Sequence, residues 1–339
     1  MAVTQHDVAL RAGVARKTVS NVIHGYKHIS PSVRTRVLEA IDELGYQPNR
    51  AAQNLRTGRS GVIALAVPEL DVSYFAELTR YVVEAAERHG LTVLIVQTLG
   101  DRDRELSTLA GFGAQAIDGL IYSPIACTAD DITSRSGQFP VVLLGEQISF
   151  PELDHVGIDN VFAARTATTH LASLGRRRIG FIGAASASHM ADLRLEGYSD
   201  ALASVGLDVD AQLVERVDGY HQPDGAEAMK RLLDRNPGNA PDAVFCANDN
   251  LALGAIRAIY DAGLTVPDDI AVVGFDDIEE AGFSRPSLTS VAPDKARIAE
   301  YAVTRLKMLI DKDEPEVLAN KSLDSLADFT LRVRESTAG

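Results

Sequence analysis

Polar side chains stand directly after several short apolar runs of this 339-residue chain. Asn248 and Asp249 follow AVFCA, Asp276 and Asp277 follow VVGF, and Glu146 follows VVLLG. Short apolar runs are typical of buried strands, and parallel sheets place ligands beyond the carboxyl ends of their strands. Carboxylates and amides at that position can exchange hydrogen bonds with the hydroxyl groups of a sugar or polyol. The sequence therefore predicts a small-molecule site built from strand ends.

A second set of polar residues lies near the N-terminus, where apolar residues recur at helical spacing. Arg16, Lys17, Thr18, Ser20 and Asn21 would project from, or bind at the ends of, a helix over residues 15–23. Arg and Lys bond guanine edges in the DNA major groove, Asn bonds adenine, and Thr and Ser suit phosphates. The alternative is a small helical bundle with a cationic surface, but the polar second helix favours DNA.

The charge distribution supports the DNA interpretation. The whole chain carries a net charge of −14, which by itself argues against nucleic acid. Residues 1–60, however, hold nine Lys and Arg against four Asp and Glu, which leaves −19 for the remainder. A basic segment on an acidic body is expected when only that segment meets phosphates. Charge alone leaves a chance fluctuation of solvated residues equally acceptable.

Three short helices are predicted to position the N-terminal residues. Thr4 and Asp7 have the spacing of a capping box, and Gly13 suits the turn after the first helix. Ser30 and Pro31 are typical of a helix start, as cap and first-turn residue. The residues predicted to face inward are Val8, Ala9, Ala12, Val19, Val22, Ile23, Val33, Val37, Ile41 and Leu44. Two helices joined by a Gly-containing turn and buttressed by a third form a helix-turn-helix pattern.

Beyond residue 61, strand-like runs such as VIALAV, LTVLIVQT and RIGFIG alternate with helix-like stretches such as residues 75–89 and 161–174. This alternation predicts an α/β core with parallel sheets. No apolar run is as long as a membrane span, and the N-terminus has no pattern of a secretory signal. Cys127 and Cys246 fit reduced thiols better than a disulfide framework. We therefore expect a cytoplasmic protein with no membrane partner.

Signatures of enzyme families do not occur in the sequence. It holds no Walker-type phosphate loop, no HExxH, no paired CxxC and no GxSxG elbow, and its eight His residues lack metal-ligand spacing. Asp276 and Asp277 are adjacent, so after a strand their side chains should diverge rather than form a catalytic pair. We expect no catalytic residues, no metal and no cofactor.

The N-terminal motifs carry a family resemblance. The run TQHDVALRAGVARKTVSNVIHG, with ISPSVRTRVLEAIDELGYQPNRAAQNLRTGRSG shortly after it, resembles the signature of the LacI/GalR family of bacterial repressors. The resemblance implies that Thr4 joins the second-helix residues in binding DNA. It also implies a hinge in which Asn49, Ala52 and Leu55 contact DNA, with Leu55 as a wedge in the minor groove. An ordinary flexible linker is the alternative. The family usually has Ser where this chain has Ala15, and losing that cap costs about 1 kcal/mol.

The resemblance covers essentially the whole chain and implies a division into domains. Residues 1–46 would form the helix-turn-helix DNA-binding domain and 47–60 the hinge. Residues 61–339 would form an effector-binding and dimerisation core related to periplasmic sugar-binding proteins. Its first lobe would hold about 61–160 and 292–324, and its second lobe about 161–291 and 325–339. The expected fold is thus an N-terminal three-helix head plus a two-lobed, periplasmic-binding-protein-like α/β core.

The resemblance also suggests which residues line the cleft between the lobes. The residues predicted to bind the effector are Tyr74, Phe75, Glu146, Arg194, Tyr220, Asn248 and Asp276. Each has a structural alternative: Asn248 suits a cap for the following helix, and the aromatic residues suit the core. Pro293 stands where sugar-binding members often have a polar residue, so the hydroxyl pattern or the ligand class differs from theirs.

Taken together, these features predict a sequence-specific transcription regulator. Two copies would pair into a homodimer and read a pseudo-palindromic double-stranded DNA operator. A small sugar-like effector would release a repressor of sugar-metabolism genes. The alternatives are a regulator that needs a purine-type co-repressor and a cytosolic sugar-binding sensor. The basic head disfavours the sensor.

Overall fold

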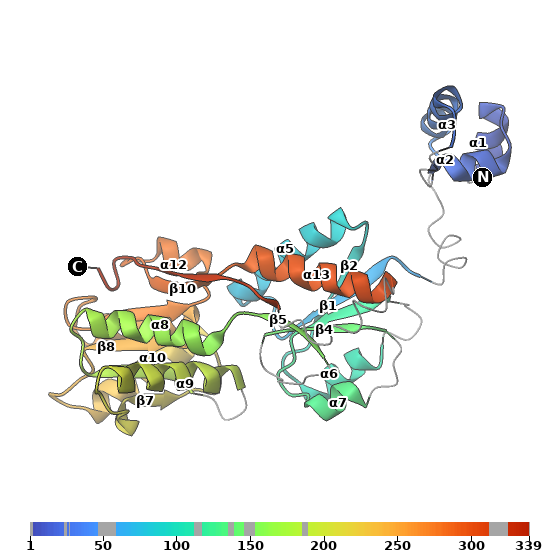
Figure 1. The fold of residues 1–339 in the computed structure, drawn as a ribbon. Coiled ribbons are helices and arrows are strands. Elements are labelled where there is room, and N and C mark those ends of the chain that lie inside the picture. Colours follow the sequence, from blue (N-terminus) through green and yellow to red (C-terminus); the bar gives the residue numbers. More distant parts are fainter. Residues whose placement is uncertain are drawn as a thin grey trace. The chain divides into compact units, whose positions relative to one another are not determined.

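The computed structural model describes residues 3–23, 26, 28–46, 59–111, 117–134, 139–145, 153–184, 189–311 and 325–338. The predicted DNA contacts Asn49, Ala52 and Leu55 and the predicted effector contact Glu146 lie outside these described residues. The chain divides into two compact units, Met1–Ser60 and Gly61–Gly339, which are described separately (Figure 1).

The described residues of the N-terminal unit form three helices, α1 (Gln5–Ala12), α2 (Arg16–Ile23) and α3 (Pro31–Leu44). The capping box forms as predicted: the Asp7 amide donates to Thr4 Oγ1 at 3.4 Å, and the Thr4 amide donates to Asp7 Oδ2 at 2.8 Å. Gly13 adopts a left-handed φ of 63° and so allows the tight turn into α2. Three valines from the three helices meet in a core that excludes water, namely Val8, Val19 and Val37.

The start of α3 differs from the prediction in one respect. Ser30 occupies the cap position, yet its side chain makes no capping hydrogen bond. Its hydroxyl lies 3.4 Å from the hydroxyl of Ser32 instead. Pro31 lacks an amide hydrogen, so the first turn has fewer donors that need a cap.

The first lobe of the larger unit is built on a sheet with the order β11-β5-β4-β3-β1-β2, in which the pairings are parallel. Its strands are β1 (Val62–Val67), β2 (Thr92–Gln97), β3 (Gly119–Tyr122), β4 (Val141–Leu144), β5 (Asp154–Gly157) and β11 (Ser325–Leu326). Helices α5 (Ser73–Arg88) and α13 (Lys295–Asp311) cover one face, and α6 (Arg102–Leu109) and α7 (Ala129–Thr133) cover the other (Figure 1). Alternate residues of β1 therefore enter two apolar cores.

The second lobe contains a sheet with the order β12-β10-β9-β8-β6-β7. Its strands are β6 (Ile179–Ala184), β7 (Val214–Arg216), β8 (Ala243–Cys246), β9 (Ala271–Phe275), β10 (Thr289–Pro293) and β12 (Phe329–Arg332). Its helices are α8 (Asn160–Ser173), α9 (His189–Ser204), α10 (Gln222–Arg235), α11 (Asp249–Asp261) and α12 (Glu279–Phe283), with a short 3-10 turn at Ala211–Leu213. Only β12 pairs antiparallel among the described strands, because it returns to this lobe along β10.

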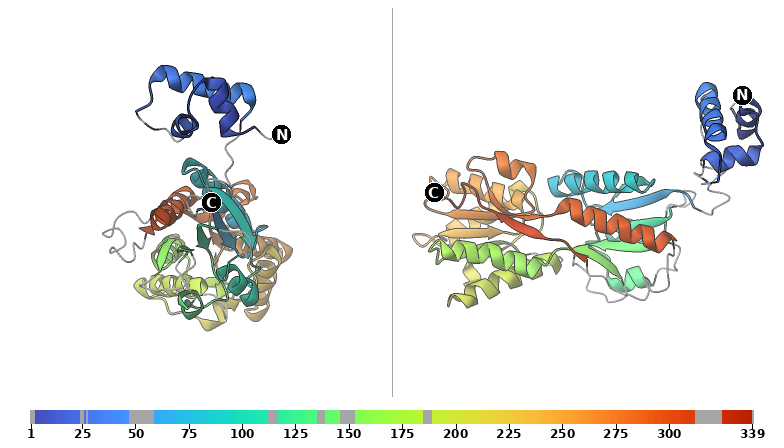
Figure 2. Two further views of the ribbon diagram at one scale, coloured as in Figure 1. Left: turned by 90° about the vertical axis from the view of Figure 1, so that its right-hand side faces the viewer. Right: turned by 45° about the horizontal axis from the view of Figure 1, so that its top comes forward.

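The chain passes between the lobes three times, and the C-terminal segment makes the last passage (Figure 2). The first passage lies between β5 and α8, near the position expected from the sequence. The other two fall about two residues later than expected. Pro293 still pairs with Phe329 in the second sheet, and Ser325 and Leu326 pair with β5 in the first. Strand pairing with distant segments decides these boundaries, which local sequence does not encode.

The described helices include none that is both long enough and apolar enough to cross a membrane.

Candidate functional site

The predicted DNA-reading residues share one short helix, α2. Val19 and Val22 turn into the core of the head and fix the rotation of the helix. Arg16 and Lys17 are exposed at its first turn. The predicted residues Thr18, Ser20 and Asn21 are half-buried on the same helix. The arrangement offers two cationic side chains to an approaching surface, backed by a rigid apolar face.

Two predicted features at the helix starts have structural consequences. The Ala15 carbonyl accepts from the amides of Thr18 and Val19, at 2.8 and 3.3 Å, and so begins α2. The methyl side chain of Ala15 offers no acceptor to those amides. Thr4, predicted as a DNA contact, donates its hydroxyl to Asp7 Oδ2 at 2.7 Å and is engaged in the capping box.

A pocket of the core lies between its lobes and takes walls from both. Its volume is about 40 Å³, enough for a few water molecules. It is lined by Tyr74, Phe75, Leu78, Ser123, Leu144, Gly145, Val156, Gly157, Ile158, Asn160, Met190, Arg194, Phe275, Asp276, Pro293 and Ile298. Four of the described residues predicted to bind an effector are among them, and so is Pro293. Tyr74 and Phe75 meet edge to face with ring centroids 5.2 Å apart, and burial together with the Asp276 carboxylate raises the pKa of Tyr74.

Arg194 is held in place on several sides within α9, with only 8% of its surface exposed. Its Nε donates to Asn160 Oδ1 at 3.0 Å, and Nη1 donates to the Ala247 carbonyl. The guanidinium carbon lies 3.6 Å from the centre of the Phe275 ring, which favours the cation. The remaining nitrogen, Nη2, lies 3.8 Å from Asp276 Oδ1. A planar guanidinium group fixed in this way can donate hydrogen bonds to a ligand with little loss of side-chain entropy.

Asp276 presents a buried carboxylate to the pocket from the end of β9. Among the described residues, the Asp276 carboxylate forms an ion pair with Arg194 at 3.8 Å and accepts no hydrogen bond. Burial raises its pKa from 3.8 to about 6, although the cations of Arg194 and Lys295 oppose that rise. Its backbone is left-handed, with φ of 103°, as is that of Asp277 at 48°. A buried acceptor without a donor suits a ligand hydroxyl or N–H group.

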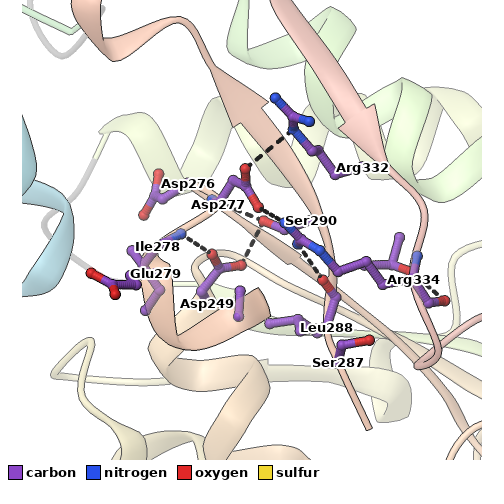
Figure 3. A network of polar contacts seen from close by, with 12 residues as sticks. Asp249, Asp276, Asp277, Ile278, Glu279, Ser287, Leu288, Ser290, Arg332 and Arg334 are labelled. Atoms are coloured by element: carbon purple, nitrogen blue, oxygen red, sulfur yellow. Dashed lines mark hydrogen bonds and ion pairs between the residues drawn. The ribbon is translucent and has the colours of Figure 1, made fainter. Parts of the chain in front are cut away.

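The neighbouring carboxylates are used inside the protein. Figure 3 shows that Asp277 turns away from Asp276, and it lies 2.6 Å from Arg334 Nη2. Asp249 accepts from the Ile278 amide at 2.9 Å and from the Ser290 hydroxyl at 2.6 Å. Burial raises the pKa of Asp249, and the nearby Asp276 carboxylate adds to that rise. This network fixes the segment after β9, and the predicted divergence of the two aspartates is confirmed.

Two of the predicted effector contacts are not among the pocket's lining residues. Asn248 Oδ1 caps α11 by accepting from the Leu251 amide at 2.8 Å, which is the structural alternative named above. Its Nδ2 donates to the Tyr220 carbonyl at 3.0 Å. Tyr220 itself packs against the apolar core. The hydrogen bond from Asn248 to Tyr220 joins the segment before α10 to the start of α11.

Sequence reasoning missed several residues of the pocket. Asn160 is buried beside Arg194 and follows β5 at a passage between lobes, so the rule of polar residues after strands could have found it. Ser123 follows β3 in the same manner. Phe275 could not be predicted as a pocket residue, because in sequence an apolar residue at a strand end resembles any core residue. No cluster of three or more potential metal ligands occurs among the residues described here.

Comparison of the sequence with protein families matches both units. The model for bacterial regulatory proteins of the lacI family matches residues 4–49, and a periplasmic binding protein-like domain matches residues 168–337. The HTH-type transcriptional repressor PurR of Mannheimia succiniciproducens is 32% identical to this chain, and the alignment covers 96% of this chain and 99% of PurR. The repressor CytR of Escherichia coli is 33% identical to this chain, and the alignment covers 99% of this chain and 96% of CytR.

Solved structures show the same relationship. A structure of the lac repressor dimer bound to operator and an anti-inducer superimposes with a TM-score of 0.83 at 28% identity, and covers the whole of both chains. The complex of the regulator CelR with cellobiose has a TM-score of 0.72 at 32% identity, over 98% of this chain and 99% of its own. The resemblance and the two-part fold inferred from the sequence are confirmed. The chain belongs to the LacI family of DNA-binding transcriptional repressors, which combine a helix-turn-helix head with an effector-binding core.

Proposed function

We propose that this repressor reads its operator with α2 inserted in the major groove. The observation that carries the proposal is the pair of exposed cations, Arg16 and Lys17, at the first turn of a helix fixed by buried Val19 and Val22. Arg and Lys in that position reach guanine edges, while Asn21 suits adenine. Thr18 and Ser20 suit phosphates. The excess of positive charge in residues 1–60 favours approach to the DNA backbone.

The protein acts as a homodimer on a pseudo-palindromic site. Two features of the core support this arrangement. Strand β2 lies at an edge of its sheet and leaves Ile95 41% exposed, while Phe283 of α12 is 83% exposed. An edge strand and large exposed apolar side chains gain free energy when a second copy covers them. A dimer would present two heads related by two-fold symmetry, and its place of action would be the cytoplasm, where the DNA lies.

The effector is a small sugar-like molecule held in the pocket between the lobes. Asp276 would accept from its hydroxyls, Arg194 and Asn160 would frame the same polar end, and Phe75 would lie against its apolar face. Because the pocket has a volume of only about 40 Å³, the lobes would move apart to admit the effector. That rearrangement would release the operator, and the coupling between the two affinities must be reciprocal. The residues would bind the effector without converting it, so the protein is not an enzyme.

A purine-type co-repressor is the second candidate. The wall formed by Phe75, Leu78, Pro293 and Ile298 is apolar and suits a flat heterocycle. Such a ligand would raise operator affinity instead of lowering it. The two candidates therefore differ in the sign of the effect on DNA binding.

A thermal-shift panel of sugars, sugar phosphates, nucleosides and purines tests the effector proposal. A ligand at about 100 times its dissociation constant adds about 2.7 kcal/mol of stability. We expect one compound to shift the melting temperature of the wild type and of Asp200→Asn, an exposed aspartate of α9. The shift should disappear in Asp276→Asn and in Arg194→Lys. Equal shifts in all four proteins would reject this pocket as the ligand site.

A further inference from the structure

The segment that carries Asp276 is held from the other lobe by two side chains. Lys295 Nζ donates to the carbonyl of Asp276 at 2.9 Å and to that of Asp277 at 3.0 Å. Glu77 Oε2 lies 2.5 Å from the same ammonium, and Glu77 Oε1 accepts from the amide of Glu279 at 3.0 Å. One ion pair thus holds both ends of the turn from Asp276 to Glu279.

These contacts join the two lobes. Glu77 belongs to α5, and Lys295 is the first residue of α13, and both helices cover the sheet of the first lobe. The turn connects β9 to α12 in the second lobe. The Ser73 hydroxyl of α5 adds a further contact by donating to Glu280 at 2.8 Å. A change in the angle between the lobes must therefore stretch or break the bonds to the turn.

The turn cannot hold its shape through backbone preference. Asp276 and Asp277 both have left-handed φ angles, and neither is glycine, so their conformation depends on the surrounding contacts. Lys295 is only 8% exposed, and an ammonium that lost these carbonyls would keep only Glu77 among the partners named here. The bonds from Lys295 and Glu77 therefore help to hold this left-handed turn in place.

We propose that Lys295 and Glu77 are positioning residues of the effector pocket, which tie the direction of the Asp276 carboxylate to the arrangement of the two lobes. The Asp276 carbonyl is bound by Lys295, while the Asp276 side chain lines the pocket. Opening of the lobes withdraws the ammonium, frees the turn and moves the carboxylate. The functional part of this inference rests on the proposed effector site, but the mechanical part does not need a ligand.

Distances between the lobes test the mechanical part. Nitroxide labels on Thr133→Cys in α7 and Lys230→Cys in α10 report on the two lobes, and both sites are exposed. The two native cysteines are buried, so they should not take up label. Labelled chains are mixed with an excess of unlabelled chains, so that most labelled dimers contain one labelled chain. The measured distance is then the one between the two labels of that chain. Electron–electron double resonance then yields the distance distribution.

We expect Lys295→Met to shift or broaden this distribution and Lys295→Arg to restore it. Lys307→Met is the matched control, because Lys307 lies in the same helix and pairs only with Asp311 among the described contacts. If Lys295→Met fails to fold, Glu77→Gln replaces it in the same measurement. Distributions that coincide for wild type, Lys295→Met and Glu77→Gln would overturn the proposal.

Titration of Asp276 tests whether the charges of Lys295 and Glu77 act on its carboxylate, as their positions indicate. The groups facing its carboxylate are Arg194 of α9, Lys295 of α13, Glu77 and Tyr74 of α5, and Asp249 of α11. The adjacent Asp277 turns away and pairs with Arg334. Carbon-13 NMR of labelled aspartates in the full chain, assigned with Asp276→Asn, follows the titration. We expect Lys295→Met to raise the pKa of Asp276 and Glu77→Gln to lower it. Unchanged titration in both variants would contradict the proposal.

The two experiments separate this inference from the proposed function. A shift in the lobe distances and in the titration, with no ligand found by the thermal-shift panel, would retain the positioning role and reject the effector site. A ligand that needs Asp276 but binds equally to Lys295→Met and wild type, with unchanged lobe distances, would reject the positioning role alone.

Discussion

Replacing Asp276 with Asn should stabilise the protein at neutral and alkaline pH. The carboxylate is 8% exposed and receives no hydrogen bond from the described residues, so its charged form is poorly solvated. Asn has the same shape without the charge. The substitution removes the cost of burying the charge but keeps the packing of the pocket wall.

The size of the effect follows from the pKa of Asp276. Folding raises that pKa from 3.8 to about 6, and each unit is equivalent to about 1.4 kcal/mol. The folded state therefore holds the proton more tightly, so the free energy of unfolding falls as the pH rises through this window. The cost is absent below the unfolded-state pKa and complete above the folded-state pKa. At pH 8, Asp276→Asn should gain about 3 kcal/mol at most, or about 5 °C in melting temperature.

Calorimetry of the full chain between pH 4 and pH 8 checks this expectation, at one protein concentration because dimer dissociation also affects melting. Asp200→Asn, at an exposed position of α9, should melt like the wild type throughout. The gap between Asp276→Asn and the wild type should be widest at pH 8 and close towards pH 4. A constant gap, or a less stable Asp276→Asn at pH 8, would refute the reasoning that this carboxylate is buried at a cost.

Four further substitutions have defined expectations. In Gly254→Ala, the new methyl would lie 1.9 Å from the Gln222 carbonyl oxygen where α10 packs on α11, so urea unfolding should show a loss of about 3 kcal/mol or more. Gly282→Ala, whose new methyl would lie 4.0 Å from the end of the Arg334 side chain, should lose less than about 0.5 kcal/mol. Ala15→Ser should add about 1 kcal/mol to the stability of the head by capping α2, and unchanged melting of the head would contradict the missing-cap interpretation. Leu55→Ala should weaken operator binding without altering effector affinity, and unchanged operator affinity would reject the minor-groove wedge.

The head could be predicted from the sequence because its signals are local. The capping spacing of Thr4 and Asp7, the turn at Gly13 and the helical recurrence of valines fixed three helices and their inward faces. Ser30 and Pro31 occupy the predicted cap and first-turn positions, although the Ser30 side chain makes no capping hydrogen bond. The alternation of strands and helices likewise predicted the α/β core, and two of the three approximate passages between lobes lie about two residues after their expected positions.

The pocket was predictable only in part. Asp276 was predicted from its position at the end of a strand, and Arg194 from a family motif. The structure places both in the lining of one pocket. Asn248 stands at an equally good strand end, yet it caps α11, since the same residue type serves both purposes. Lys295 was not predicted, because the carbonyls and the carboxylate that it binds lie far from it in sequence and such contacts leave no local pattern.

Selection of bound fragments from genomic DNA tests the central claim most directly. The full-length protein is mixed with sheared DNA at near-physiological salt, and the retained fragments are sequenced. The account predicts enrichment of one pseudo-palindromic sequence by the wild type and its loss in the double variant Arg16→Ala, Lys17→Ala, whose side chains are exposed on α2. Retention of fragments without a shared sequence, or the same enriched sequence with the double variant, would contradict operator reading by α2.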